Sequence, residues 1–378
     1  MTSEVCSYEV GAAPEWARAA ALPVVAAAPP RSAVAVALRH GDRRAVVTHG
    51  RTAHEGGVPV TADTRFEAGS LTKCFTALLL AEQAARGEVS YGDPLSRFLP
   101  PDALPPAHGA SPALLHLATH TAGLPRLPPG MLTGAAARWF SNPYAEFTTA
   151  DLLRALARTR LRTPPGSRVR YSNFGVGLLG HLLTRAAPSR PEYGALLADR
   201  VLTPLGLART TCAPDAAQAT GYWHGRPREP WQIHGLAGAG AVRSSARDLL
   251  TLLDVLADAS QESPGHCEAT GTESTPLRAA LVDATRPRLA LPGGTRRMAL
   301  VWNIRVRPGG EVYHHSGGTR GFTAFAGFGP RDRTAVVALA NTQPSADQRF
   351  IQSAYNALLS LPASGETEPT GDPINRAR

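Results

Sequence analysis

Cysteine is scarce in this sequence: its 378 residues include four, and no two of them form a Cys-x-x-Cys pair. Scattered cysteines argue against a disulfide framework or a zinc knuckle, and they suit a reducing compartment. No apolar run approaches the ~20 residues that cross a bilayer, so we expect no membrane span. Glu4, Glu9 and Glu15 precede the first arginine, unlike the basic start of a secretory leader. We therefore expect a cytoplasmic protein; secretion is the alternative if residues 1–28 act as an atypical signal.

Aromatic residues are also few, at 6% of the chain, and none lies within the densest arginine cluster, from Arg158 to Arg170. The net charge of +9 is otherwise spread along the chain as single arginines. A nucleic-acid surface normally interleaves basic and aromatic side chains. We therefore expect no nucleic-acid partner, and instead a solvated rim that attracts anionic substrates.

Signals for a metal or a cofactor are weak. His116 and His120 stand four apart, but Leu117 takes the place where metalloproteases carry glutamate, so we interpret both histidines as capping and structural residues. Glycines at 175, 177 and 180 match the dinucleotide pattern, yet the segment before them is too polar for a buried parallel strand. Close helix packing explains these glycines better. We expect neither a metal nor a cofactor.

Lysine occurs once among the 39 lysines and arginines, as Lys73. The chain uses arginine at every other basic position, so a lysine retained here suggests a position where the side chain must release its proton. Arginine cannot do this. Ser70 stands three residues earlier, where an apolar pattern predicts the start of a helix. Residues i and i+3 share a helix face, so the amine is aimed at the hydroxyl. A surface lysine left over by chance is the alternative.

Hydrophobic patterning predicts an α/β (α+β) fold: an antiparallel sheet flanked by helices, with an inserted helical lobe. The sheet would come from residues 1–65 and 285–361, the lobe from 66–284, and 362–378 would be a disordered tail of one composite domain. The expected strands are 34–38, 44–47, 298–306, 311–316, 322–328 and 334–339. The expected helices are one opening at Pro14, one at Ser70, and 111–118, 149–157, 175–185, 245–257 and 346–361. Residues 258–276 read as a polar surface insertion.

Three short segments resemble the serine β-lactamase and penicillin-binding superfamily in order and spacing. They are Ser70-Leu-Thr-Lys73, Tyr171-Ser-Asn173 and His315-Ser-Gly317. The Tyr-Ser-Asn form is similar to the branch of class C β-lactamases, D-alanyl-D-alanine carboxypeptidases and related esterases. The resemblance extends over about residues 30–360 and includes Leu117–Leu124, Pro204–Leu207, Gly238–Gly240 with Asp248, and Val336–Asn341.

The resemblance implies a role for each motif residue. Ser70 would form an acyl-enzyme, with Lys73 as its base or as the cation that holds Tyr171 as a phenolate. Tyr171 would carry the proton to the leaving group and activate water. Asn173 would hydrogen-bond Lys73 and the substrate's acyl amide. The backbone N–H groups of Ser70 and Gly318 would form the oxyanion hole. Ser316 and Gly317 would contact the bound substrate.

His315 departs from the pattern of the family that the chain resembles. Most β-lactamases have lysine at this position, where it contacts the substrate carboxylate. A histidine at this position resembles the carboxypeptidase and esterase members instead. At neutral pH it supplies less positive charge than lysine does. Arg320 is a candidate replacement for that anion contact; a rim arginine is the alternative. Tyr222, Trp223 and Trp231 either line the acyl pocket or pack under a loop.

The prediction is a serine hydrolase that cleaves an amide or ester in a small molecule or peptide. The alternatives are an acyl-transferring or peptide-tailoring enzyme of the same fold, and a slow-acylating sensor module. Oligomeric state, true substrate and the identity of the acylation base stay open.

Overall fold

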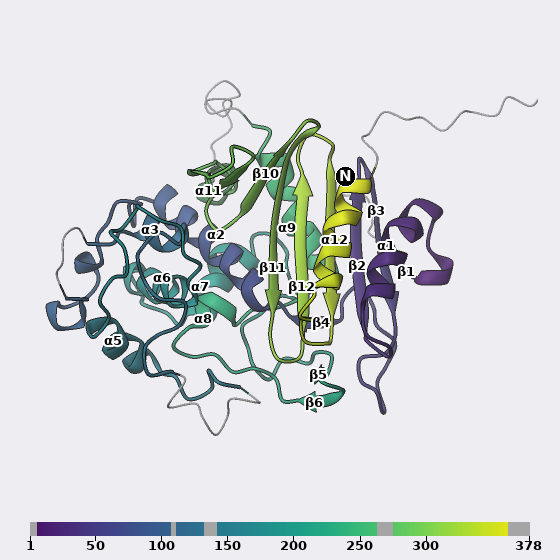
Figure 1. The fold of residues 1–378 in the computed structure, drawn as a ribbon, viewed down its shortest axis with the longest axis horizontal. Helices are drawn as coiled ribbons and strands as arrows, with labels where there is room; N and C mark the ends of the chain where they lie inside the picture. The colour runs from purple at the N-terminus through teal and green to yellow at the C-terminus, as the bar shows by residue number, and fades with distance from the viewer. Residues whose placement is uncertain (1–5, 107–110, 132–141, 263–274, 362–378) are drawn as a thin grey trace, which may run out of the picture.

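One large sheet organises the protein (Figure 1). The computed structural model describes residues 6–106, 111–131, 142–262 and 275–361. Nine strands follow the order β1-β3-β2-β13-β12-β11-β10-β9-β8. Every neighbouring pair is antiparallel except β1 with β3, which is parallel. The predicted antiparallel sheet with flanking helices is confirmed, apart from this parallel edge.

The strands of the large sheet are β1 (Cys6–Glu9), β2 (Val34–His40), β3 (Arg43–His49), β8 (Leu289–Leu291), β9 (Arg296–Met298), β10 (Asn303–Arg307), β11 (Gly310–Gly318), β12 (Thr323–Gly329) and β13 (Thr334–Ala340). Two small sheets pair β4 (Arg65–Glu67) with β7 (Arg243–Ser245), and β5 (Gly221–Trp223) with β6 (Arg226–Arg228).

The described helices are α1 (Glu15–Ala27), α2 (Thr72–Ala85), α3 (Leu114–Ala118), α5 (Thr149–Ala157), α6 (Asn173–Ala186), α7 (Tyr193–Leu197), α8 (Ala237–Gly240), α9 (Ala246–Ala259), α11 (Pro276–Ala284) and α12 (Arg349–Ser360). No helix within those ranges is long and apolar enough to cross a bilayer.

Alternation along the central strands divides the interior into two cores. On β2, the even-numbered Val34, Val36 and Leu38 pack with α1 and α12, whereas Ala35 and Ala37 face the larger core that holds α2 and α9. Successive side chains of a strand point to opposite faces, which is why both faces of this buried strand are apolar. In Figure 1, α12 covers one face of the sheet and α9 the other.

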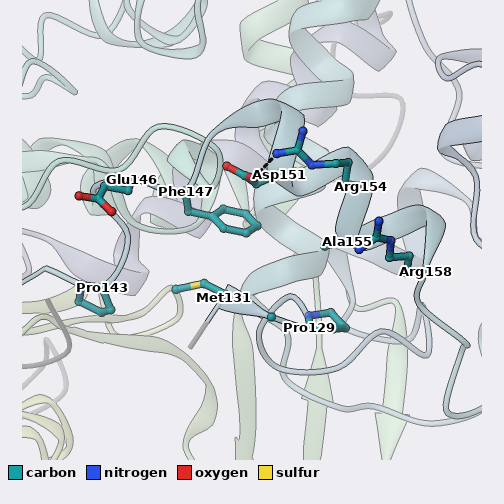
Figure 2. Close-up of a pocket in the computed structure, with 10 residues that line it drawn as sticks. Pro129, Met131, Pro143, Glu146, Phe147, Asp151, Arg154, Ala155 and Arg158 are labelled. Carbon is teal, nitrogen blue, oxygen red and sulfur yellow. Dashed lines mark hydrogen bonds and ion pairs between the residues drawn. The ribbon is translucent and has the colours of Figure 1, made fainter. Parts of the chain in front are cut away.

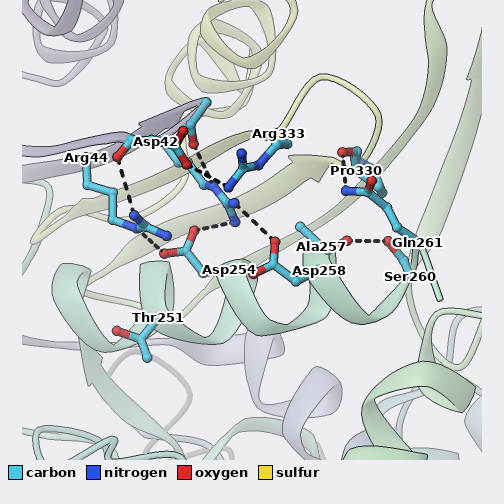
Figure 3. Close-up of polar contacts among 12 residues, drawn as sticks. Asp42, Arg44, Thr251, Asp254, Ala257, Asp258, Ser260, Gln261, Pro330 and Arg333 are labelled. Carbon is cyan, nitrogen blue, oxygen red and sulfur yellow. Dashed lines mark hydrogen bonds and ion pairs between the residues drawn. The ribbon is translucent and has the colours of Figure 1, made fainter. Parts of the chain in front are cut away.

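Ion pairs tie α9 to the neighbouring strands β2 and β3 (Figure 3). Arg39 on β2 is fully buried and donates to Asp254 and Asp258, each at 3.1 Å. Arg44 on β3 donates to the other oxygen of Asp254. A buried guanidinium needs such partners because an unpaired buried charge is very costly. The register of α9 against the sheet is therefore set by charge as well as by its apolar face.

Two predicted elements differ from the structure. The single strand expected over 298–306 is two strands, β9 and β10, which turn at Ala299–Trp302 with Val301 at φ +67°. The turn residues are apolar because they enter the larger core, and this burial disguised them as a strand. The helix expected over 111–118 begins only at Leu114, since Pro112 and Ala113 remain in the preceding extended segment, where Pro112 accepts from Leu95.

The opening helix, the hairpin at Gly41 and the final helix are confirmed, with boundaries that shift by a few residues. The four strands of the two small sheets, β4 to β7, and the edge strands β1 and β8 of the large sheet were not predicted. The expected tail at 362–378 lies outside the described residues, as do 263–274 of the expected surface insertion.

Glycines on α6 let it approach α8 closely. A Cβ at Gly177 would lie 2.3 Å from the Leu236 side chain, and one at Gly180 would lie 2.9 Å from Gly238. A larger residue would push the two backbones apart. Close helix packing, the interpretation favoured from the sequence for these glycines, is confirmed, and it carries the backbone of Ala239 toward α2.

Candidate active site

Ser70 lies at the point where α2 begins. The turn Gly69–Leu71 leads directly into α2, and Ser70 is part of that turn. Its Oγ accepts a hydrogen bond from Lys73 Nζ at 2.9 Å and another from the Tyr171 hydroxyl at 2.6 Å. The structure therefore brings the serine, the amine and the phenol to one point, although Tyr171 is 101 residues away along the chain.

Lys73 is fully buried. Its Nζ also donates to the carbonyl of Ala239 at 2.7 Å, on the α8 backbone that the α6 glycines bring close. Burial lowers the pKa of Lys73 below its ordinary value of 10.5, while the neighbouring Tyr171 acts in the opposite direction. A lysine in this position can release its proton far more readily than one in water. The resemblance implied a hydrogen bond between Nζ and Asn173. Among the described residues, the hydrogen bonds of Nζ go to Ser70 and Ala239 instead.

Glycines bring β11 against the turn that carries Ser70. A Cβ at Gly317 would lie 2.1 Å from the carbonyl oxygen of Ala68 and 2.9 Å from the Ser70 nitrogen. Gly69, at φ +51°, has the backbone of Gly318 where a Cβ would be, with its nitrogen 2.6 Å away. Only glycine fits either place. The backbone nitrogens of Ser70 and Gly318 thus lie on facing segments beside the serine hydroxyl.

His120 holds the loop that carries Tyr171. Its Nδ1 accepts from the Ser172 N–H at 3.2 Å, and its ring lies 4.7 Å from the Tyr171 ring. The Ser172 hydroxyl donates to the Pro125 carbonyl and accepts from the Gly175 N–H, which caps α6. The structural role expected of His120 is confirmed. His116 does the same for α3, since its Nδ1 accepts from the Ala113 N–H at 3.0 Å.

His315 is buried on β11 and faces the same centre. Burial lowers its pKa to about 3, and the charges of Lys73 and the neighbouring histidines add to the effect. Its Nδ1 has no hydrogen-bond partner among the described residues. The imidazole is therefore neutral at pH 7, so it cannot offer a substrate carboxylate a positive charge.

A narrow cavity of about 30 Å³ opens over Ser70, with room for about one water molecule. It is lined by Gly69, Ser70, Tyr144, Asn173, Trp231, Ile233, Leu236, Ala239, Gly240 and Gly318. Asn173 donates to the Tyr144 hydroxyl at 3.5 Å, and its Oδ1 is buried without a partner in the described part of the chain. An amide oxygen left unsatisfied in a cavity wall invites a hydrogen-bond donor from a ligand.

Trp231 lines this cavity and is held in place by Glu67 and Tyr144. Its backbone N–H donates to the buried carboxyl of Glu67 at 2.6 Å, and its ring lies 5.1 Å from that of Tyr144. Burial raises the pKa of Glu67, opposed by this hydrogen bond and by Arg243. Of the three aromatic residues considered from the sequence, Trp231 lines the cavity. Tyr222 instead stacks on His54, with ring centres 3.6 Å apart.

Arg320 lies beyond the cavity. Its guanidinium carbon is 4.8 Å from the centre of the Trp223 ring. Ser316, two residues before Gly318, is half-buried and pairs with Phe325 of β12. Arg126, which the sequence did not single out, lies with its guanidinium 5.2 Å from the centre of the Tyr171 ring.

A separate hollow of about 350 Å³ lies beside α5 (Figure 2). Met131, Phe147 and Arg158 are among the residues that line it, and Asp151 there pairs with Arg154. It shares no lining residue with the cavity over Ser70. Within the described ranges, His, Cys, Asp and Glu side chains form no group of three or more that could hold a metal.

Residues 24–360 match the Beta-lactamase family. The chain belongs to the Beta-lactamase family. The D-alanyl-D-alanine-carboxypeptidase/endopeptidase AmpH of Escherichia coli K12 is 33% identical over 186 residues, 49% of this chain and 46% of AmpH. The Esterase EstB of Burkholderia gladioli is 33% identical over 185 residues, 46% of this chain and 45% of EstB. These two alignments thus span about half the length of each relative.

The fold agrees with that membership. A class C beta lactamase structure from Rhodobacter sphaeroides superposes with a TM-score of 0.74 at 25% identity, covering 92% of this chain and 99% of that one. The predicted family is therefore confirmed.

For this Beta-lactamase family chain, sequence reasoning missed three parts of the site: the Ala239 carbonyl, Tyr144 and Arg126. A carbonyl contact leaves no side-chain signal. Tyr144 and Arg126 stand outside the three motifs, and only the fold places them near Tyr171.

Proposed function

We propose that this protein is a serine hydrolase that cleaves esters or amides through an acyl-enzyme on Ser70. The observation that carries the proposal is the pair of hydrogen bonds to Ser70 Oγ, one from Lys73 and one from Tyr171. An unassisted serine hydroxyl is a poor nucleophile, and a base within hydrogen-bonding distance activates it.

In the proposed first step, the Ser70 oxygen attacks the substrate carbonyl carbon while its proton passes to Lys73. Neutral Lys73 suits this role because burial lowers its pKa. The carbonyl oxygen gains the negative charge, which the N–H groups of Ser70 and Gly318 would stabilise at about 3 kcal/mol per donor in comparable hydrolases.

In the second step, the carbon–leaving-group bond breaks and Tyr171 hands a proton to the departing alcohol or amine, recovering one from Lys73. Water then attacks the acyl carbon, loses its proton through the same pair, and the Ser70 oxygen leaves with a proton. Asn173 would meet the acyl amide through its unpaired Oδ1 if that amide carries an N–H.

Carboxypeptidase or esterase chemistry is favoured over efficient β-lactam hydrolysis. A neutral, buried His315 stands where most β-lactamases place a charged lysine, so a β-lactam carboxylate would lose that charge contact. AmpH and EstB carry the carboxypeptidase and esterase names among the similar proteins. We also propose a cytoplasmic location, which cell fractionation would test; Cys74 and Cys212 are free thiols.

The proposal is tested by turnover of 4-nitrophenyl esters, D-alanyl-D-alanine peptides and a chromogenic cephalosporin. Wild-type protein should hydrolyse an ester or peptide faster than the cephalosporin. Ser70→Ala should remove turnover. Its free energy of unfolding should stay within about 0.5 kcal/mol of wild type, since little packing is lost. Undiminished turnover in Ser70→Ala would refute the acyl-enzyme.

A slow-acylating binding role is the second candidate, because the cavity over Ser70 has room for about one water molecule. Intact-protein mass after penicillin exposure separates the two roles. A transient adduct with product release supports the enzyme, whereas a persistent one-to-one adduct supports the binding role.

A further inference from the structure

Two arginines meet one tryptophan at the rim of the active site. The guanidinium carbons of Arg228 and Arg320 lie 5.0 Å and 4.8 Å from the centre of the Trp223 ring. The ring attracts each cation, but the cations repel each other. Burial lowers the pKa of Arg320, Tyr144 opposes this shift, and the charge of Arg228 adds to it. The Nε of Arg228 is buried without a hydrogen-bond partner among the described residues.

The fold holds this pair in place. The β5–β6 hairpin carries Trp223 and Arg228, and the turn between β11 and β12 carries Arg320. Tyr222 on β5 donates its N–H to Gly321 in that turn at 3.3 Å. A Cβ at Gly221 would lie 3.0 Å from the Gly321 Cα, so the two segments are in direct backbone contact. The two arginines therefore belong to one preorganised surface.

This surface adjoins the cavity over Ser70. Arg320 is two residues past Gly318, which lines the cavity, so the Cα atoms of these two residues are at most about 7 Å apart. Tyr144 lines the same cavity and interacts electrostatically with Arg320. The leaving group must lie beside Tyr171, which supplies its proton, whereas β11 leads from His315 past Gly318 to Arg320. An acyl half laid along β11 would therefore extend toward the two arginines.

We propose that Arg228 and Arg320, held against Trp223, form a carboxylate-binding site that selects substrates with an anionic group at the far end of the acyl chain. The proposal rests on the function proposed above. An anion at the edge of the ring relieves the repulsion between two cations and satisfies planar donors suited to a carboxylate. Because the Cα atoms of Gly318 and Arg320 are at most about 7 Å apart, an acyl chain of roughly six carbons is long enough to reach from the cavity toward this site.

A matched pair of esters tests the selectivity. Mono-4-nitrophenyl adipate carries a carboxylate at the end of a six-carbon acyl chain, and 4-nitrophenyl hexanoate is its neutral counterpart. We expect kcat/KM for the adipate to exceed that for the hexanoate by about tenfold at low salt, with the preference shrinking at high salt because ions screen a partly exposed charge contact. Equal values would overturn the proposal.

Variants assign the preference to these residues. Arg228→Ala and Arg320→Ala should each lower the adipate-to-hexanoate ratio toward one, and the ratio corrects for any general loss of activity. Arg307→Ala removes one exposed arginine at the end of β10 and should keep the tenfold ratio. Arg126→Ala removes the cation beside Tyr171. A ratio that falls only in Arg126→Ala would contradict the assignment.

A binding measurement separates this proposal from the catalytic one. In Ser70→Ala protein, monomethyl adipate should quench the fluorescence of Trp223, which is identified by its loss in Trp223→Phe. Methyl hexanoate should not, and Arg228→Ala should weaken the adipate effect severalfold. Quenching without wild-type turnover of either ester would reject the hydrolase and retain the anion site. Equal quenching by both ligands, or none, would reject the anion site alone.

Discussion

The two faces of the large sheet differ in the kinds of side chain that they bury. Between the sheet and the pair α1 and α12, the core is assembled from apolar side chains such as Val36, Phe325 and Phe350. On the opposite face, the apolar core surrounds fully or nearly fully buried polar residues, among them Lys73, His120 and His315. Burying polar groups costs free energy unless they are bonded. Their concentration on one face marks where the fold gives up stability to shift pKa values, and Ser70 lies there.

Lys73→Arg should have the largest effect on activity. The variant keeps a positive charge but cannot deprotonate, so kcat/KM should fall about 10³-fold if the amine is a base. Steady-state hydrolysis with the preferred ester measures this. Retention of at least a third of wild-type turnover would show that charge alone suffices and that deprotonation is not needed.

Tyr171→Phe should reduce kcat/KM roughly 10²-fold, because the ring remains but the proton carrier is lost. Tyr144→Phe is the matched control: it removes a hydroxyl that contacts Asn173 but not Ser70, so its effect should stay below about tenfold. Equal losses in both variants would place the Tyr171 hydroxyl outside the reaction.

Phe350→Ala examines the other face. The ring is buried between α12 and the sheet, so its removal should cost about 3–5 kcal/mol of unfolding free energy, measured in urea. The kcat/KM of the folded protein should not change. A large fall in kcat/KM without loss of stability would break the distinction between the two faces.

His315→Gln should change the acid dependence of stability. The unfolded imidazole binds a proton near pH 6.5, but the folded one does so only near its pKa of about 3. Between these values the unfolded state binds more protons, so stability falls as pH decreases. Removing the titration should flatten this slope by up to about 1.4 kcal/mol per pH unit, seen in urea midpoints at pH 7 and pH 5. An unchanged slope would mean that His315 binds its proton as readily in the folded protein as in the unfolded one.

Local signals made part of this site predictable. Ser70 and Lys73 are one helical turn apart, and Tyr171 was identified because a short motif and its order along the chain match a known family. The burial that lowers the pKa of Lys73 comes from α8 and β11, far away in sequence, so it could not be read from the motif itself. The role proposed for Arg320 also needed the fold, because the docking of β5 on the Gly321 turn brings Arg320 to Trp223.

Fold prediction succeeded and failed for related reasons. Strands such as β2 and β13 are continuous apolar runs bounded by turns, and they were found within one or two residues. The segment at Met298–Ile304 is also mostly apolar, yet it folds into two strands and a buried turn. Composition reports burial, and only tertiary contacts decide the local shape.

The most direct test is covalent labelling by a fluorophosphonate, followed by peptide mapping and a measured rate of modification. The account predicts a single label on Ser70 in the wild-type protein, and labelling at least about 10²-fold slower in Lys73→Arg because the hydroxyl is no longer activated. A label on any other residue, or the same labelling rate in both proteins, would contradict it.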